Sequence, residues 1–333
     1  MLLNLDRHFN IRLALGNAQT GPWVPDATTI KHSLRIEVIK YFNRYTRRVE
    51  TESIYGESSL RWIYGTPLGK LALHALAKRA VFSKFYGWLM NRPSSRKRIA
   101  PFIKRYHLQE AEFQRPANSF ENFNEFFYRK LKPGARPIAS VENAIIFPAD
   151  GRHLAFQDYS ACPGLVVKGQ VFKLEELIQD SGLARTYASG SLLISRLCPV
   201  DYHRFHFPAA GLPGATFLIE GHLQSVSPIA LAQRIRILST NRRCRTELQT
   251  KQIGRVLTIE VGATCVGGFS YTFLPGQPVE KGDEKGFFRF GGSLTMTLFE
   301  PGRVRFDADL LDNSANLLET YARMGDQAGL RVG

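Results

Sequence analysis

The sequence predicts an α+β fold in which a basic, amphipathic helical N-terminal region precedes a mostly antiparallel, β-rich body. From Ser33 to about Pro133, apolar and charged side chains follow a helical pattern. After Arg136, short apolar runs rich in β-branched and aromatic residues alternate with Gly, Pro, Asp and Asn. These runs follow one another too closely for crossovers through helices, so we expect mostly antiparallel pairing.

Residues 1–35 are predicted to form an irregular extension, because Gly16–Pro25 contains two glycines and two prolines that favour turns. Asp6, Arg7 and His8 come too early for the apolar stretch of a signal peptide. The sequence has no run of 18 or more apolar residues, so we expect no membrane-spanning segment.

Residues 36–137 are predicted to be a helical, basic, membrane-docking region. Thr66 followed by Pro67 is typical of a helix N-cap with proline at the first helical position. The segments 67–91 and 95–106 mix Leu, Phe, Tyr and Trp with Lys and Arg, and a third helix fits 121–133. Basic amphipathic helices of this kind suit an anionic membrane interface.

The charge of the protein is concentrated in this region. The net charge is +15, and residues 31–140 contain 22 Lys and Arg against 8 Glu and no Asp, a difference of +14. Such an excess indicates an anionic partner, either nucleic acid or an acidic membrane. We see no nucleic-acid-binding motif, and the simpler alternative is a solvated helical surface whose apolar face packs on the protein's own core.

Residues 138–333 are predicted to form the β-rich body. One short helix fits 173–181. Strands are expected within the apolar runs at 144–152, 164–172, 191–208, 255–273 and 287–299.

The four cysteines form no CxxC pair and have no zinc-site spacing; they are Cys162, Cys198, Cys244 and Cys265. We interpret them as reduced, mostly buried thiols of a cytoplasmic protein and expect no metal site.

Three stretches of the body offer reactive side chains. PADGR places Asp150 in a turn, DYHRFHFP contains His203 and His206, and FGGSL places Ser293 directly after Gly292. A carboxylate that orients an imidazole, which then deprotonates a serine, is a known way to activate a poor nucleophile.

Each residue also has an ordinary structural interpretation. Asp150 is a common turn residue, one histidine could belong to the core, and Ser293 could follow a β-bulge. The HxxH spacing at His203 and His206 could suggest a metal, but no third ligand stands nearby in the sequence.

Taken together, these motifs resemble the phosphatidylserine decarboxylase family, in its bacterial type II-like, pyruvoyl-dependent branch. The resemblance runs from about residue 39 to the C-terminus. It is carried by IKYFNRYT, FFYRKLKPGARPI, FPADGR, VKGQVFKLEELI, PVDYHRFHFP, IEVGATCVGGF, KGDEKGFFRFGGS and NSANLLETYARMGDQAG, in that order.

The resemblance implies that the protein cuts its own Gly292–Ser293 bond. In this reading Asp150, His206 and Ser293 form the charge relay for cleavage. Ser293 becomes a covalent pyruvoyl group at the start of a small α chain, 293–333, which stays with a large β chain, 1–292. Glycine before the serine permits a backbone that other residues resist.

The resemblance also implies decarboxylation of phosphatidylserine to phosphatidylethanolamine through a Schiff base with the pyruvoyl group. His203 is then the proton donor. Because a regular strand would point His203 and His206 to opposite faces, we expect a bend or bulge there. The expected location is peripheral, on the cytoplasmic face of an anionic cell membrane, with a higher homo-oligomer possible.

Three alternatives remain open at this point. The first is a serine hydrolase that uses Asp150, His206 and Ser293 without self-cleavage, although it lacks the GxSxG elbow. The second is a non-catalytic relative that binds membranes or nucleic acid. The third is a pyruvoyl decarboxylase that acts on a soluble amino acid.

Overall fold

The computed structural model describes residues 39–332, apart from 54–56, 67, 70–79, 161–172, 234, 264–267 and 291–292. The predicted extension 1–35, the expected strand at 164–172, Cys162, Cys265 and Gly292 therefore lie outside the described residues.

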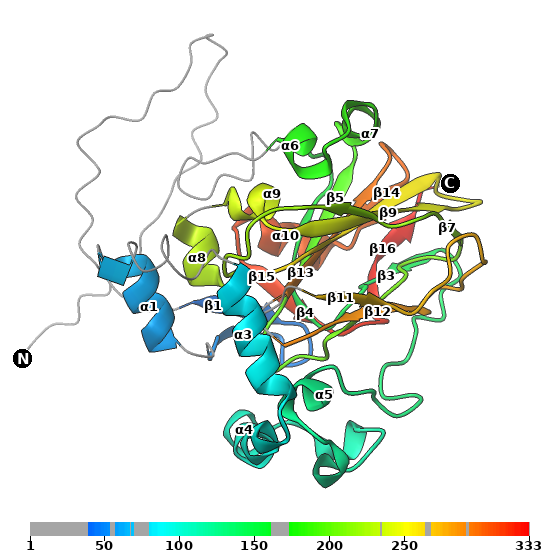
Figure 1. The fold of residues 1–333 in the computed structure, drawn as a ribbon. Coiled ribbons are helices and arrows are strands. Elements are labelled where there is room, and N and C mark those ends of the chain that lie inside the picture. Colours follow the sequence, from blue (N-terminus) through cyan, green and yellow to red (C-terminus); the bar gives the residue numbers. More distant parts are fainter. Residues whose placement is uncertain are drawn as a thin grey trace, which may run out of the picture. The chain divides into compact units, whose positions relative to one another are not determined.

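The centre of the fold is a ten-stranded sheet in the described part of the chain, with strand order β2-β1-β15-β4-β5-β13-β10-β9-β7 and β8 also paired to β9 (Figure 1). Its neighbours pair antiparallel except for β1 and β15, which are parallel. The strands are β1 (Lys40–Asn43), β2 (Arg48–Thr51), β4 (Gly151–Phe156), β5 (Ser191–Leu197), β7 (Leu212–Pro213), β8 (Phe217–Ile219), β9 (Arg243–Gln249), β10 (Arg255–Val261), β13 (Ser293–Phe299) and β15 (Glu319–Ala322).

Two smaller sheets complete the described β structure. One has the order β11 (Phe269–Tyr271), β12 (Glu284–Phe288), β6 (Arg204–His206), and the other β14 (Val304–Phe306), β16 (Gln327–Arg331), β3 (Ala144–Ile146). The predicted α+β class and the antiparallel pairing are thus confirmed.

The central strands β5 and β13 are buried along their whole length, because apolar layers cover both faces of the sheet. One layer gathers around Leu177, Tyr187 and Met296, the other around Phe147, Phe207 and Phe299. Short helices contribute to these layers: α6 (Leu174–Ile178), α7 (Ser181–Tyr187), α8 (Pro228–Gln233), α9 (Ile237–Thr240) and α10 (Ala308–Ala315).

The single helix predicted at 173–181 is two helices in the structure. Helix α6 ends because Gln179 takes a left-handed conformation with φ 52°. Asp180 then begins α7 as an N-cap, its side chain accepting the Leu183 N–H at 3.0 Å. A capping aspartate favours a new helix start over continuation.

The helices before the body include α1 (Glu57–Gly65), α3 (Ala80–Asn91), α4 (Ile99–Tyr106) and α5 (Phe123–Phe127). The 3₁₀ turns η3 (Pro93–Arg98), η4 (Glu110–Glu112) and η5 (Ala117–Ser119) connect them. A phenylalanine-rich cluster holds α3, α4 and α5 together and includes Phe290, which immediately precedes the FGGS glycines. This region therefore packs directly on the segment that leads to Ser293.

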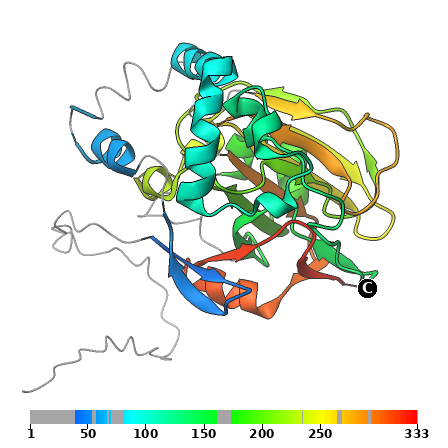
Figure 2. The same cartoon turned by 90° about the horizontal axis from the view of Figure 1, so that it is seen from below.

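The prediction of helix from Ser33 onward is wrong for residues 40–51, which form the β1–β2 hairpin. Strand β1 pairs in parallel with β15, with Tyr41 opposite Glu319, and Figure 2 shows the blue hairpin beside the red strand β15. Directly after the hairpin, Glu52 forms a buried ion pair with Arg196 of β5 at 2.6 Å. These contacts with distant segments override the local pattern.

Candidate active site

Ser293 is the first residue of β13 and lies opposite Leu197 of β5 in the centre of the main sheet. Its side chain is fully buried, and its Oγ has no hydrogen-bond partner in the described part of the structure. A buried hydroxyl without a partner costs about 1–3 kcal/mol, so its presence in a core strand indicates a role other than stability.

The two histidines are held in the same tautomer. Nδ1 of His203 donates to the carbonyl oxygen of Asp201 at 3.0 Å, and Nδ1 of His206 donates to that of Gly282 at 2.9 Å. Because carbonyl oxygens only accept, the proton sits on Nδ1 and Nε2 carries a lone pair. Both Nε2 atoms are buried without a partner among the described residues, so each can accept a proton.

The backbone around the histidines departs from a regular strand. His203 lies before β6, and its carbonyl accepts the Phe288 N–H at 3.0 Å. The ladder between β6 and β12 shifts register between Glu284 and Gly286. His203 thus lies outside the regular strand, whereas the extra residue of the bulge lies in β12, on the opposite side of the ladder.

Aromatic rings connect His203 to the segment before Ser293. The Phe127 ring lies 3.8 Å from the His203 ring between centroids, and Phe290 lies 4.9 Å from Phe127. The Phe290 N–H donates to Oδ1 of Asn124 at 2.9 Å. Helix α5 thus fixes both the imidazole of His203 and the chain that enters the FGGS segment.

Burial keeps both imidazoles neutral at pH 7. It lowers the pKa of His203 to about 3, although the Asp201 carbonyl opposes this change. Burial also lowers the pKa of His206, while Gly282, Glu284 and Asp150 act to raise it. Two neutral imidazoles with bare Nε2 atoms are bases when they first meet a substrate.

Asp150 is buried and fully engaged with another partner. Nε of Arg136 donates to both of its oxygens at 2.9 Å, Nη2 donates to Oδ2 at 2.7 Å, and the Met324 N–H donates to Oδ1 at 2.9 Å. Asp150 affects His206 through its charge, whereas Nδ1 of His206 bonds to Gly282. The direct Asp150–His206 hydrogen bond of a relay is absent from the contacts between these described residues.

Sequence reasoning missed two arginines that support this site. Arg136 holds Asp150, and Arg152 holds Asp201 at 2.6 Å, the residue whose carbonyl orients His203. Arg136 lies within FFYRKLKPGARPI and Arg152 within FPADGR. A buried carboxylate needs a paired cation. The presence of arginines in the same motifs was therefore the signal that could have identified these two partners.

No metal centre is evident in the described ranges, where no group of three His, Cys, Asp or Glu side chains could hold an ion. None of the described helices is long and apolar enough to cross a membrane.

Comparisons with known proteins agree on one family. A family model described as phosphatidylserine decarboxylase matches residues 123–329. The chain is similar to three curated phosphatidylserine decarboxylase proenzymes. The protein of Fusobacterium nucleatum is 41% identical over 296 residues, 89% of this chain and 99% of that one. The protein of Desulfitobacterium hafniense is 40% identical over 294 residues, which cover 88% of this chain and 99% of that one. The protein of Chlamydia muridarum is 44% identical over 291 residues, which cover 87% of this chain and 97% of that one.

Proposed function

The chain belongs to the phosphatidylserine decarboxylase family of carboxy-lyases, and we propose that it converts phosphatidylserine to phosphatidylethanolamine and CO₂ after cutting itself. The observation that carries the proposal is a set of three buried atoms without partners in the described structure: Oγ of Ser293 and Nε2 of His203 and His206. A nucleophile and two neutral bases are what self-cleavage followed by decarboxylation requires.

Self-cleavage begins at Ser293. Nε2 of His206 takes the hydroxyl proton while Oγ attacks the carbonyl carbon of Gly292; the C–N bond breaks, the proton passes to the nitrogen, and an ester joins the pieces. Loss of the α-proton of residue 293 then releases Gly292 as a carboxylate and leaves dehydroalanine. Water replaces its nitrogen, which frees ammonia and leaves a ketone at residue 293.

The surroundings of Ser293 fit such a pyruvoyl group. The position is fully buried at the start of a central strand, and the hydroxyl makes no hydrogen bond with the described residues that the conversion would break. When present, the ketone supplies an electron sink for the pair left behind as CO₂ departs.

His203 is the proton carrier for decarboxylation in this proposal. Its bare Nε2 accepts a proton from the substrate ammonium and later returns it to the α-carbon that lost CO₂. The carbonyl of Asp201 and the Phe127 ring stabilise the imidazolium between the two events. One proton enters and leaves, so the neutral imidazole is restored.

The two chains stay associated because the small chain is interleaved with the large one. Strand β13 lies between β5 and β10, and β15 lies between β1 and β4. Strand β16 pairs with β3 of the large chain. Separation would break five ladders at once, so we propose a heterodimer of the two pieces.

A direct experiment tests the reaction. Purified protein should show two chains by intact mass, with a keto group at residue 293, and should release CO₂ from phosphatidylserine vesicles but not from free serine. Hydroxylamine, a carbonyl trap, should inactivate it. A single full-length chain that hydrolyses esters would support a serine hydrolase instead, and release of CO₂ from free serine alone would support a decarboxylase of soluble amino acids.

We further propose that α3 and η3 dock the enzyme on an anionic membrane. Phe85 and Trp88 are 56% and 51% exposed and stack at 5.8 Å. The guanidinium of Arg92 lies 4.7 Å from the Trp88 ring, and Arg96, Lys97 and Arg98 are exposed beside it. Exposed aromatic rings next to a basic cluster suit the headgroup level of such a membrane.

Replacing both Phe85 and Trp88 with alanine should weaken binding to phosphatidylserine vesicles by about tenfold or more, since each ring buries large apolar area. Turnover of detergent-dispersed substrate should change little. Co-sedimentation with vesicles measures the effect, and Leu274→Ala, at an exposed leucine outside α3 and η3, is the control. Equal vesicle binding by the double variant and the control would contradict the proposal.

A further inference from the structure

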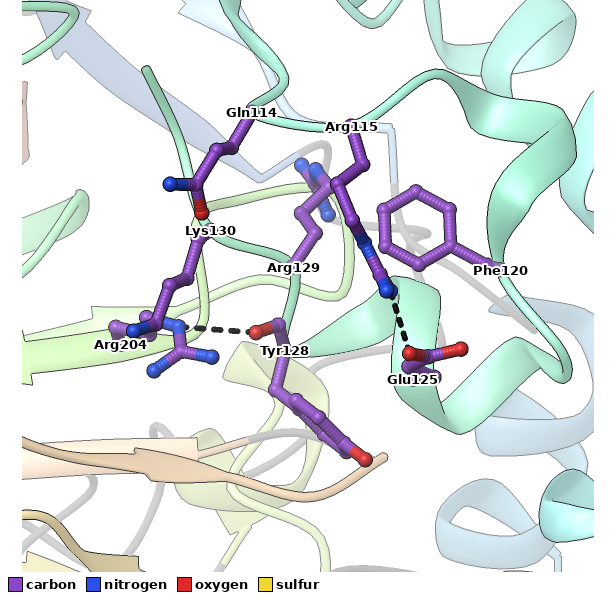
Figure 3. A pocket seen from close by; sticks show the side chains of 8 residues that line it. All are labelled: Gln114, Arg115, Phe120, Glu125, Tyr128, Arg129, Lys130 and Arg204. Atoms are coloured by element: carbon purple, nitrogen blue, oxygen red, sulfur yellow. Dashed lines mark hydrogen bonds and ion pairs between the residues drawn. The ribbon is translucent and has the colours of Figure 1, made fainter. Parts of the chain in front are cut away.

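A basic cavity of about 270 Å³ lies beside α5 (Figure 3). Four cationic side chains and one carboxylate line it: Arg115, Arg129, Lys130, Arg204 and Glu125. Arg115 pairs with Glu125, and Arg204 pairs with Glu284 at 2.7 Å. The cavity wall therefore keeps two cations, Arg129 and Lys130, that have no ion-pair partner among the described residues.

Arg129 is the less ordinary of the two. Its side chain is 5% exposed, and its Nε and Nη1 have no hydrogen-bond partner in the described structure. The guanidinium lies 4.9 Å from the rings of Phe113 and Phe126. Burial lowers its pKa to about 10, so it stays charged at pH 7. A buried, charged donor that lacks an acceptor indicates a site built for an anion.

The cavity adjoins the candidate active site. Arg129 lowers the pKa of His203 through its charge, although burial is the larger cause. Arg204 follows His203 directly, and its Nε donates to the carbonyl of Tyr128 at 3.0 Å. Phe127, whose ring contacts His203, belongs to the same segment as Arg129 and Lys130.

We propose that this cavity binds the phosphodiester anion of the substrate headgroup, an inference that rests on the proposed function. In phosphatidylserine only one oxygen and one methylene separate the phosphorus from the α-carbon that loses CO₂. A headgroup whose α-carbon reaches Nε2 of His203 therefore carries its phosphate only a few bonds from that atom, and Arg129 is the charged side chain that affects the pKa of His203. Arginine forks and a lysine ammonium are the usual partners of phosphate oxygens.

Lys130 provides the safest test because its side chain is exposed and its replacement should not disturb folding. Lys130→Gln should raise KM for phosphatidylserine about tenfold, as expected for one lost charge-assisted hydrogen bond, and leave kcat nearly unchanged. The phosphate is bound equally in the ground state and in the transition state, so losing its contact with Lys130 raises KM and leaves kcat unchanged. Arg129→Gln should act in the same direction, and Lys251→Gln, at an exposed lysine outside the cavity, should have no effect.

Binding of soluble headgroups separates the possible sources of the anion without turnover. Glycerophosphoserine and glycerophosphoethanolamine should bind the full-length protein in calorimetry and bind about tenfold more weakly to Lys130→Gln. If inorganic phosphate binds as tightly as these diesters, or if only vesicles of phosphatidylglycerol depend on Lys130, the assignment to the substrate headgroup is wrong. If Lys130→Gln and Lys251→Gln bind the diesters equally, the cavity is not the site.

The same measurements distinguish this inference from the proposed reaction. Protein that releases no CO₂ but loses diester binding in Lys130→Gln would refute the decarboxylase proposal and support the cavity as a phosphodiester site. Protein that turns over normally with an unchanged KM in both Lys130→Gln and Arg129→Gln would support the reaction and refute the cavity.

Discussion

Replacing Ser293 with alanine is expected to leave the chain in one piece and to abolish decarboxylation. The substitution removes the oxygen that attacks Gly292 and later leaves with it, so neither the ester nor the dehydroalanine that precedes the ketone can form. Oγ has no partner among the described residues of the uncleaved chain, so its loss should cost no hydrogen bond. The free energy of unfolding should be equal to or slightly higher than that of the uncleaved wild-type precursor. Intact mass, CO₂ release from phosphatidylserine and a denaturant titration measure the three effects.

Ser195 offers a matched control on the neighbouring strand. It is also a buried serine, and its Oγ lies 2.9 Å from Nδ1 of His153. Ser195→Ala should still be cleaved and active, but it should lose about 1 kcal/mol of stability because a buried partner is left unpaired. Cleavage or turnover by Ser293→Ala would refute the proposed maturation, whatever Ser195→Ala does.

The success of the fold prediction has a physical reason. Strands such as β5 and β13 are buried on both faces. Their sequences, SLLISRL and SLTMTLF, are short runs rich in Leu, Ile, Met and Phe, which are recognisable without tertiary information. The β1–β2 hairpin has no such pattern; its strand order depends on β15, near the other end of the chain. Local sequence therefore predicted β5, β10 and β13, but it missed the β1–β2 hairpin at the edge and also β9 and β15 within the sheet.

In the candidate site, too, the residue types could be predicted from the sequence, whereas the contacts between them could not. Residue types and the family resemblance made Ser293, His203 and His206 candidates, and the structure leaves a polar side-chain atom of each without a partner in the described residues. The roles of a charge relay imply a direct hydrogen bond between Asp150 and His206. In the structure Asp150 instead pairs with Arg136, and Nδ1 of His206 donates to the carbonyl oxygen of Gly282. Backbone acceptors carry no sequence signal, so such competition is visible only in the structure.

Replacing His203 with alanine is expected to separate the two reactions of the protein. Because Nε2 of His206 serves cleavage, the His203→Ala chain should still divide into two pieces, at least in part, whereas His206→Ala should not. Decarboxylation by the cleaved His203→Ala protein should fall by about 10²–10⁴-fold, the usual contribution of a general acid–base. Intact mass follows cleavage, single-turnover CO₂ release follows decarboxylation, and His222→Ala, an exposed histidine, is the control.

The pH dependence of unfolding shows whether the variant has kept the fold. Burial lowers the folded pKa of His203 to about 3, against about 6.5 in an unfolded chain. As pH falls below about 6.5, His203 binds a proton in the unfolded state but not in the folded state. The free energy of unfolding of the wild type therefore decreases by about 1.4 kcal/mol per pH unit through this residue, until the pH nears the folded pKa. His203→Ala should therefore lose stability less steeply between pH 6.5 and 5 than the wild type. A variant with this shallower slope and full turnover would show that the imidazole is buried as described but is not the proton carrier.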